Sequence, residues 1–334
     1  MKIVITGLPQ AGQQELFSII SGQDIEQIRQ KPMEAQTGAS DVKDPRVTKL
    51  VEIFNPKKTT YAKIEYSLLP DVAFQGALLK NADEICYVSL SDNAAGNIQS
   101  FVSELIIADM MLVDKRLETL VKEQKKKNGE AQKKEQDLMA KCKEWLEKEN
   151  PLSKMELAEE QAKTVKTYQF LTFKPLVLVI NVPEDKINDR SIVREIKTKY
   201  SYPCIQLSAG IEAEINQLSA KDRADFMKEV GIDEPAIDKM NRVVFEGLGL
   251  ISFFTVGEDE VRAWPIKKGA VAEEAGGGIH SDIKKGFVRV EMMKYNDFIA
   301  LGSEAKVKEA GKFSLKGRDY LVEDGDLLSF RFNV

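Results

Sequence analysis

The residues whose types and spacing could do chemistry follow the first apolar run of the chain. Two glycines frame a short turn made of Gly7, Leu8, Pro9, Gln10, Ala11, Gly12, Gln13 and Gln14. Their spacing is that of the phosphate loop G-x-x-x-x-G-K-[ST], in which the Lys neutralises phosphate charge and the hydroxyl holds Mg²⁺. Here Gln13 replaces the Lys and Gln14 replaces the Ser or Thr. Neutral glutamines supply neither the charge nor a good metal ligand, so we do not expect the usual ligands to hold Mg²⁺.

The two glycines leave two functions open for this turn. Successive backbone N–H groups can form a nest that accepts an anion without help from side chains. The alternative is a turn that only connects a strand to a helix. A multi-histidine zinc site is excluded and a Ser-His-Asp triad is not expected, because His280 is the only histidine. Three widely spaced cysteines without a C-x-x-C pair predict no disulfide framework.

Length and charge narrow the class of protein. A chain of 334 residues predicts two or three domains, and its composition is that of a soluble globular protein. With 48 basic and 53 acidic residues, the net charge of -5 excludes a surface that is basic all over, so any RNA contact must come from a local patch. We expect a cytoplasmic monomer with no signal peptide, membrane span or DNA partner.

Apolar runs predict the elements that must position the turn. An apolar strand precedes it, and 16–20 belongs to the helix that follows. A short amphipathic helix is predicted over 44–54, with Asp44 as its N-cap and Pro45 in its first turn. Further strands are predicted at 62–69, 85–90, 176–180 and 204–207. The last two are followed by the polar stretches Asn181-Val182-Pro183-Glu184 and Ser208-Ala209.

The middle of the chain predicts an antiparallel helical hairpin. From Asn97 to Tyr168 the pattern is helical, and Asn128-Gly129 marks the turn between two helices. Apolar stripes are expected at Leu105, Ala108, Met111 and Leu112 on the first helix, and at Leu138, Met139, Cys142, Trp145 and Leu146 on the second. We interpret the hairpin as a solvated, mixed-charge arm; a nucleic-acid patch at Lys125-Lys126-Lys127 is the alternative.

The last third of the chain reads as a compact α+β unit. Short strands are predicted at 250–255, 260–264 and 327–332, separated by polar turns. Phe253, Phe254 and Trp264 are expected in its core, with a base-stacking platform as the alternative. Basic residues could form a local phosphate-contacting face or a merely solvated surface, and they are Arg262, Lys284, Lys285 and Arg289.

Taken in order, these landmarks resemble the YchF family of Obg-like ATPases over nearly the whole chain. In the last third the resemblance rests on 260–264, 279–282, 285–287, 295–298, 308–312, 324–326 and 330–334. In the first two thirds it rests on Asp44-Pro45-Arg46, 168–175, Ser208-Ala209 and 211–215. The resemblance implies a P-loop NTPase-type α/β sheet domain over 1–105 and 168–247. It also implies an inserted helical coiled coil over 106–167 and a β-grasp-like TGS domain over 248–334.

The resemblance also implies ligands and partners. Family members prefer ATP to GTP because their base-reading motif is Asn-x-x-Glu, which Asn181 and Glu184 match. Ser208 and Ala209 match the loop that contacts the base, so the base side of the site looks intact. The alternative for Asn181 and Glu184 is an ordinary loop with an N-cap. Association with ribosomes and RNA, through the TGS and coiled-coil parts, is a family property.

The departures from the family pattern separate two hypotheses. Besides Gln13 and Gln14, the Asp-x-x-Gly motif is replaced around 67–79, and the switch stretch before Asp44 looks short. The first hypothesis is therefore a catalytically impaired protein that acts as a regulator or scaffold on ribosomal or other RNA. The second is a slow ATPase, or less favourably GTPase, whose missing groups are supplied from elsewhere.

Overall fold

The computed structural model describes residues 2–70, 74, 76–124 and 129–333. The chain divides into two compact units, one of Met1–Gly38 and Glu65–Ile237, the other of Ala39–Ile64 and Asp238–Val334. Both are mixed α/β, as the predicted fold class requires. The predicted basic triplet 125–127, the turn residue Asn128 and the stretch 71–73 lie outside the described residues.

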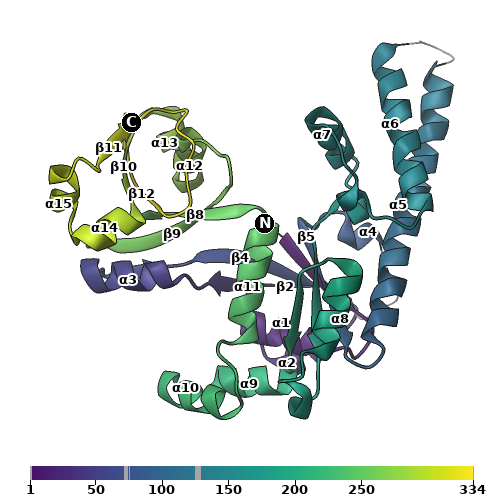
Figure 1. The fold of residues 1–334 in the computed structure, drawn as a ribbon, viewed down its shortest axis with the longest axis horizontal. Coiled ribbons are helices and arrows are strands. Elements are labelled where there is room, and N and C mark those ends of the chain that lie inside the picture. The colour runs from purple at the N-terminus through teal and green to yellow at the C-terminus, as the bar shows by residue number, and fades with distance from the viewer. Residues whose placement is uncertain (1, 71–73, 75, 125–128, 334) are drawn as a thin grey trace. The chain divides into compact units, whose positions relative to one another are not determined.

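A sheet of order β2-β4-β1-β5-β6-β7 lies mainly in the first unit, and 39–42 of β2 and 62–64 of β4 belong to the second (Figure 1). Its strands are β1 (Lys2–Gly7), β2 (Gln36–Val42), β4 (Ala62–Leu68), β5 (Glu84–Leu90), β6 (Leu176–Asn181) and β7 (Cys204–Leu207). The pairs β1–β4, β1–β5, β5–β6 and β6–β7 are all parallel. The turns that follow β1, β5, β6 and β7 therefore open at the same edge of the sheet, which is where parallel sheets bind ligands.

Helices of the first unit begin and end at recognisable signals. Gly22 ends α1 in a left-handed conformation, Asp24 caps α2 with its side chain, and Ser219 caps α10 in the same way. The α-helices are α1 (Gln13–Ser21), α2 (Ile25–Arg29), α4 (Gly76–Leu79), α5 (Ala94–Gln124), α6 (Glu130–Glu147), α7 (Glu159–Thr167), α8 (Ser191–Tyr200), α9 (Ala209–Gln217) and α10 (Ala220–Glu229). Short 3₁₀ helices lie at Leu152–Lys154, Leu171–Phe173 and Glu184–Lys186.

The predicted helical arm is formed by α5 and α6, which lie side by side (Figure 1). Of the predicted stripe on α6, Leu138, Met139, Cys142 and Leu146 are buried, and Trp145 packs against the same cluster. Among the described helices, α5 has the length and apolar composition of a membrane span. Its side chains at Ile98, Val102 and Val113 are buried in the core, and core helices of soluble proteins can have the same length and composition.

The second unit is a three-layer arrangement around a sheet of order β11-β10-β12-β8-β9-β3. The strands are β3 (Lys58–Thr60), β8 (Leu250–Thr255), β9 (Glu260–Lys267), β10 (Phe287–Lys294), β11 (Ser314–Lys316) and β12 (Asp326–Phe332). The helices are α3 (Pro45–Phe54), α11 (Ala236–Gly247), α12 (Ala272–Ile279), α13 (Ser281–Lys285), α14 (Tyr295–Leu301) and α15 (Glu304–Glu309). As predicted, Asp44 caps α3 and Pro45 occupies its first turn.

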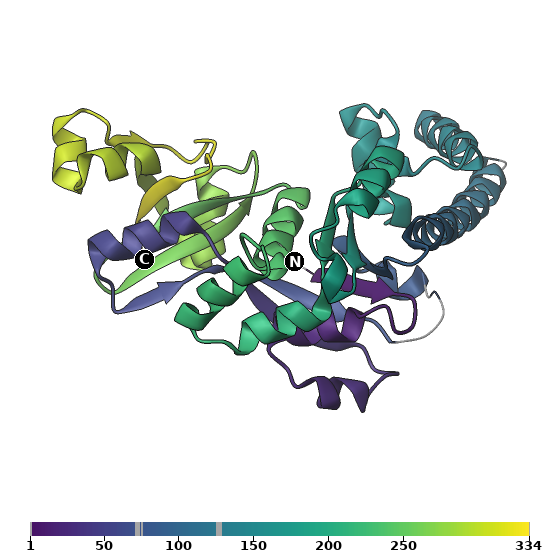
Figure 2. The ribbon, with the colours of Figure 1, turned by 60° about the horizontal axis from the view of Figure 1, so that its bottom comes forward.

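Neighbouring aromatic residues of β8 define the two faces of this sheet. Phe253 packs in a cluster with Ala272 and Ala275 of α12, whereas the next residue, Phe254, contacts Tyr295 of α14. Adjacent strand residues point to opposite faces, so α12 covers one face and α14 the other. Helix α3 contacts β9 (Figure 2). It lies on the Phe254 side of the sheet, where the Arg46 guanidinium is 5.0 Å from the centroid of the Phe254 ring. The prediction that both phenylalanines belong to the core is confirmed.

Candidate functional site

The turn after β1 has the strand–turn–helix geometry that its glycines predict. The Ala11 N–H donates to the Leu8 carbonyl at 3.0 Å, and the Leu16 N–H donates to the Gly12 carbonyl at 2.9 Å as α1 begins. Gln10 has φ 64° and Gly12 has φ 96°, so the turn passes twice through the left-handed region. Only glycine adopts a φ of 96° without strain, which is the local reason for Gly12.

The two glutamines take positions at the start of α1. Gln13 is buried, with 3% of its surface exposed, and Gln14 is half-buried. Neither residue carries a charge, and the neighbouring strand β4 ends at Ser67 and Leu68, both buried and neither acidic. Gln13 and Gln14 therefore offer no cation for a phosphate, and Ser67 and Leu68 offer no carboxylate at the end of β4.

Asn181 joins this turn to the loop after β7. Its Nδ2 donates to the Ala11 carbonyl at 3.2 Å, and its Oδ1 accepts from the Ala209 N–H at 3.1 Å. Both polar ends of the amide are engaged with backbone groups. Asn181 therefore positions two loops, and this is a structural role beside the base-reading role predicted for it.

Gly12 is where this arrangement is most sensitive to substitution. A Cβ at this position would lie 2.3 Å from Asn181 Nδ2, in addition to the strain of φ 96°. We expect Gly12→Ala to lower the free energy of unfolding by about 1–3 kcal/mol. Gly22→Ala is the matched control, because Gly22 also has a positive φ (68°) but nothing within 4 Å of its added Cβ. Urea unfolding of both variants should show the larger loss for Gly12→Ala; equal losses would mean that the contact with Asn181 is relieved without penalty.

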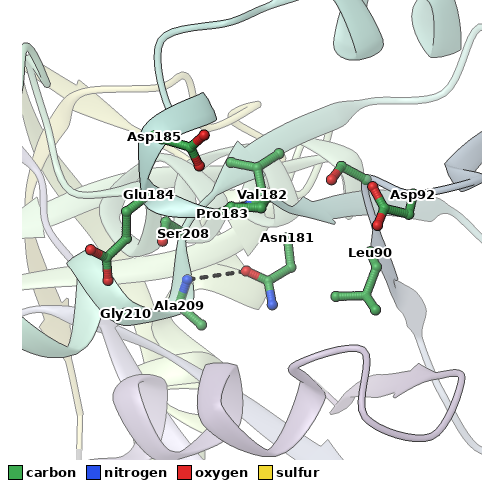
Figure 3. A pocket seen from close by; sticks show the side chains of 11 residues that line it. Leu90, Asp92, Asn181, Val182, Pro183, Glu184, Asp185, Ser208, Ala209 and Gly210 are labelled. Atoms are coloured by element: carbon green, nitrogen blue, oxygen red, sulfur yellow. Dashed lines mark hydrogen bonds between the residues drawn. The ribbon is translucent and has the colours of Figure 1, made fainter.

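A pocket of ≈ 700 Å³ opens beside Asn181, at the carboxyl ends of β5, β6 and β7 (Figure 3). It is lined by Leu90, Ser91, Asp92, Asn181, Val182, Pro183, Glu184, Asp185, Ser208, Ala209 and Gly210. The structure thus brings together all four predicted base-binding residues, Asn181, Glu184, Ser208 and Ala209. It adds Asp92, Asp185 and Leu90, which the sequence reasoning missed. Asp92 follows β5 just as Glu184 follows β6. Its position after a buried strand is therefore the sequence feature from which it could have been predicted.

The Glu184 carboxylate lies against the first turn of α9. A Cβ added at Gly210 would lie 2.4 Å from Oε1 at the end of the exposed Glu184 side chain, so that side chain would have to move. A carboxylate at a helix N-terminus is stabilised by the helix dipole. Glu184 therefore presents an acceptor to the pocket, and Figure 3 shows Asp92 on the other side of Asn181 in that view.

Comparison with known proteins places the chain. A family model named YchF-GTPase_C, described as a protein of unknown function (DUF933), matches residues 250–333. The Bacillus subtilis (strain 168) protein named "Ribosome-binding ATPase YchF" is 37% identical over 361 positions, which cover 99% of this chain and 98% of that protein. The chain belongs to the YchF family.

Other YchF proteins agree with this assignment. The Pasteurella multocida (strain Pm70) protein of the same name is 34% identical, with 100% of this chain and 99% of that protein covered. A solved structure, of the Schizosaccharomyces pombe YchF GTPase, matches with a TM-score of 0.88 at 25% identity, and covers 99% of this chain and 97% of that one. The Bacillus subtilis alignment spans 361 positions against 334 residues here, so at least 27 positions (361 less 334) fall opposite gaps in this chain.

The YchF family implies a nucleoside triphosphate with Mg²⁺ at the turn after β1, and the residues present do not fit that group. Gln13 and Gln14 occupy the positions of the phosphate-binding Lys and the Mg²⁺-binding hydroxyl. Among the described residues, no group of three or more His, Cys, Asp or Glu side chains is arranged to hold a metal ion. In this chain the residues on the base side of the site therefore match the family motif, whereas those on the phosphate side do not.

The four predicted RNA-contacting residues do not share one face of the second sheet. The Arg262 guanidinium lies 3.7 Å from the centroid of the Trp264 ring. The two residues are two positions apart on β9 and therefore point to the same face of the sheet, which is the face that α12 covers. Lys284 and Lys285 end α13, which packs on α12 through Ile283 and Gly276. Arg289 precedes Val290, which packs in the α12 cluster, so Arg289 points to the opposite face, across from Arg331 on β12.

Proposed function

We propose that this YchF-family chain is a ribosome-associated regulatory or scaffold protein whose nucleotide hydrolysis is impaired. Relatives named ribosome-binding ATPases, at 31–37% identity over full length, support the ribosome as partner. The same names support a purine nucleotide as the ancestral ligand, with ATP favoured over GTP by the Asn181 and Glu184 pair. A cytoplasmic monomer that binds neither membrane nor DNA fits this role.

One observation carries the impairment: Gln13 and Gln14 stand where phosphate chemistry needs a cation and a hydroxyl. Arg and Lys clamps and Mg²⁺ supply most of the catalysis in phosphoryl transfer, because there is little covalent chemistry for the protein to do. A buried neutral amide at the position of the Lys cannot offset the charge that develops on the phosphoryl oxygens.

Two measurements on the purified chain test this function. Phosphate release from ATP should stay at background with and without Mg²⁺, while a YchF relative that retains the Lys serves as the positive control. Sedimentation with ribosomes in the absence of nucleotide should recover the chain in the ribosome fraction at low salt and release it as salt rises. Absence from that fraction at low salt would overturn the ribosome partner, and Mg²⁺-dependent turnover would overturn the impairment.

The basic residues enter the same sedimentation experiment. If the second unit contacts ribosomal RNA through α13, the double substitution Lys284→Glu and Lys285→Glu should weaken binding and flatten its salt dependence. Because Arg289 points to the other face of the sheet, weaker ribosome binding by Arg289→Glu would place the RNA contact on that face instead of at α13.

We also propose a division of the chain into three domains. The first is formed by 1–105 with 168–247, the second by 106–167, and the third is a TGS domain at 248–334.

A slow ATPase is the second candidate, and the pocket beside Asn181 favours it. The pocket keeps Glu184, Ser208 and Ala209 together, as a base-binding site needs. In that case Glu184→Ala should change base preference or abolish a measurable turnover. Identical background release by wild type and Glu184→Ala would remove this candidate.

A further inference from the structure

We propose that the pocket beside Asn181 binds an uncharged nucleoside that carries an exocyclic amino group, and that added phosphates weaken binding. The proposal rests on the proposed function in one respect, namely that this pocket is the ligand site inherited from the family. It departs from the family in the class of ligand, because the phosphate part of the family's ligand has no partner here. Three features of the structure lead to it.

The pocket ends at Asn181 and does not reach the phosphate turn. None of the residues from Gly7 to Gln14 lines it. The Asn181 amide, which spans from the Ala11 carbonyl to the Ala209 N–H, closes the side that faces the turn. The pocket therefore has room for a base and a sugar, while phosphates on that ligand would extend toward a turn in which Gln13 replaces the phosphate-binding Lys.

The charge of the pocket opposes phosphate. Its lining contains the carboxylates of Asp92, Glu184 and Asp185 and no Lys or Arg. The neighbouring cavity of ≈ 340 Å³, which shares Ala209 and Gly210, includes one cation, Arg29. That guanidinium already pairs with Glu15 at 2.8 Å and with Glu26 at 2.9 Å. Like charges within a few ångströms repel, so each added phosphate should lower affinity.

The pocket does offer groups that recognise a base. The Glu184 carboxylate, which lies beside the first turn of α9, can accept hydrogen bonds and so selects for an amino group. Leu90, which is 43% exposed, and the exposed Pro183 supply apolar surface for the flat face of a ring. Adenine and guanine both carry an amino group, so the shared chemistry is an aminopurine nucleoside, and the experiment must distinguish the two.

The test is isothermal titration of the full chain with adenosine, guanosine, AMP, ADP and ATP, each with and without Mg²⁺. We expect a nucleoside to bind at least tenfold more tightly than its triphosphate, with no gain from Mg²⁺. Raising the salt concentration should reduce the difference in affinity between nucleoside and triphosphate, because screening weakens the repulsion between the phosphates and the carboxylates of the pocket. Tighter binding of ATP with Mg²⁺ than of adenosine would overturn the proposal, and so would the absence of binding by any nucleoside at millimolar concentration.

Substitutions in the pocket can distinguish recognition of the base from repulsion of the phosphates. Glu184→Ala should reduce nucleoside affinity about tenfold, as expected for the loss of a charged hydrogen bond. The double substitution Asp92→Asn and Asp185→Asn should instead improve ATP binding relative to adenosine. Glu195→Gln, an exposed carboxylate on α8 outside the pocket, is the control and should change neither affinity.

The two proposals can fail separately. Ribosome sedimentation is measured without nucleotide, so a chain that binds ribosomes but no nucleoside would overturn only the inference about the pocket. A chain that binds nucleoside but no ribosomes would overturn only the proposed partner. Circular dichroism of each variant checks that it is folded. If Glu184→Ala does not fold, the Asp92→Asn and Asp185→Asn variant still decides the question, and an unchanged ratio of ATP to adenosine affinity would contradict the proposal.

Discussion

Replacing Asp109 with Ala should lower the free energy of unfolding of the unit that carries the helical arm by about 3–4 kcal/mol. Asp109 lies on α5 and is 1% exposed. Its carboxylate accepts from the Leu171 N–H at 2.8 Å, the Thr172 N–H at 2.7 Å and the Thr172 hydroxyl at 2.7 Å. Truncation to Ala leaves two backbone donors and a hydroxyl buried without that acceptor. The segment that returns the chain from the arm to β6 would then lose its attachment to α5.

The electrostatics of Asp109 point the same way. Burial raises the pKa of this carboxyl, while the hydrogen bonds from Thr172 and Leu171 act in the opposite direction without fully offsetting it. The buried charge is therefore tolerated only because all three donors are present.

The chain contains two tryptophans, one in each unit, and this allows a clean measurement. In a Trp264→Phe background, Trp145 on α6 reports on the arm, because its indole Nε1 donates to the Pro151 carbonyl at 3.0 Å. Urea unfolding followed by Trp145 fluorescence should show the full loss for Asp109→Ala. The control is Asp114→Ala, which removes an exposed pair with Lys143 and should change stability by less than about 1 kcal/mol. A loss no larger than that of the control would contradict the role assigned to Asp109.

Asp109 also shows why the arm was predicted only in part. The helical period of the sequence predicts an apolar stripe at Leu105, Ala108, Met111 and Leu112. Leu105 is buried as expected, but Met111 is 69% exposed, so this part of the prediction is wrong. The inward position is taken instead by Asp109, whose donors come from residues more than sixty positions away. A local hydrophobic pattern cannot register a polar group that is buried for a distant partner.

The positions of the strands were predictable because each apolar run is local in the sequence. Their pairing was not predictable, because paired strands can be far apart in the sequence. The predicted strands at 176–180 and 204–207 correspond to β6 and β7 within one residue. The pairing of β3 with β9, in which Lys58 lies opposite Glu260, joins segments two hundred positions apart. This pairing groups 39–64 with the C-terminal unit, whereas the predicted division assigns 39–64 to the first domain. Nothing in the sequence of 58–60 indicates its partner.

The candidate site was predictable where residue type alone decides. Glycine spacing identified the turn, and the substitution of both glutamines was visible without a structure. The double engagement of Asn181 and the clash that excludes a side chain at Gly12 depend on the positions of three loops. They become visible only when the parallel sheet brings the ends of β1, β6 and β7 together.

Lys294→Met should destabilise the second unit by about 3–5 kcal/mol, because it leaves a buried carboxylate without its cation. Asp326 is fully buried and accepts from Lys294 Nζ at 2.7 Å, from the Tyr320 hydroxyl at 2.9 Å and from the Glu323 N–H at 2.9 Å. Met keeps the volume of the Lys stem, so the loss isolates the charge. Trp264 fluorescence in a Trp145→Phe background reports on this unit. Lys308→Met, which removes an exposed pair with Glu304 within one helix and a contact with the Phe313 ring, should change stability by about 1 kcal/mol or less.

The pH dependence gives this prediction a second readout. Burial lowers the pKa of Lys294, but its hydrogen bonds to Asp326, Glu323 and Tyr320 outweigh burial, so the net pKa is raised. A lysine whose pKa is higher in the folded than in the unfolded chain contributes stability below its unfolded pKa, about 10.4, and loses it as pH rises through the folded value. The gap between wild type and Lys294→Met should therefore be constant at neutral pH and shrink in alkali. A gap that stays constant as pH rises above the unfolded pKa would mean that lost packing, rather than the lost ammonium, destabilises the variant.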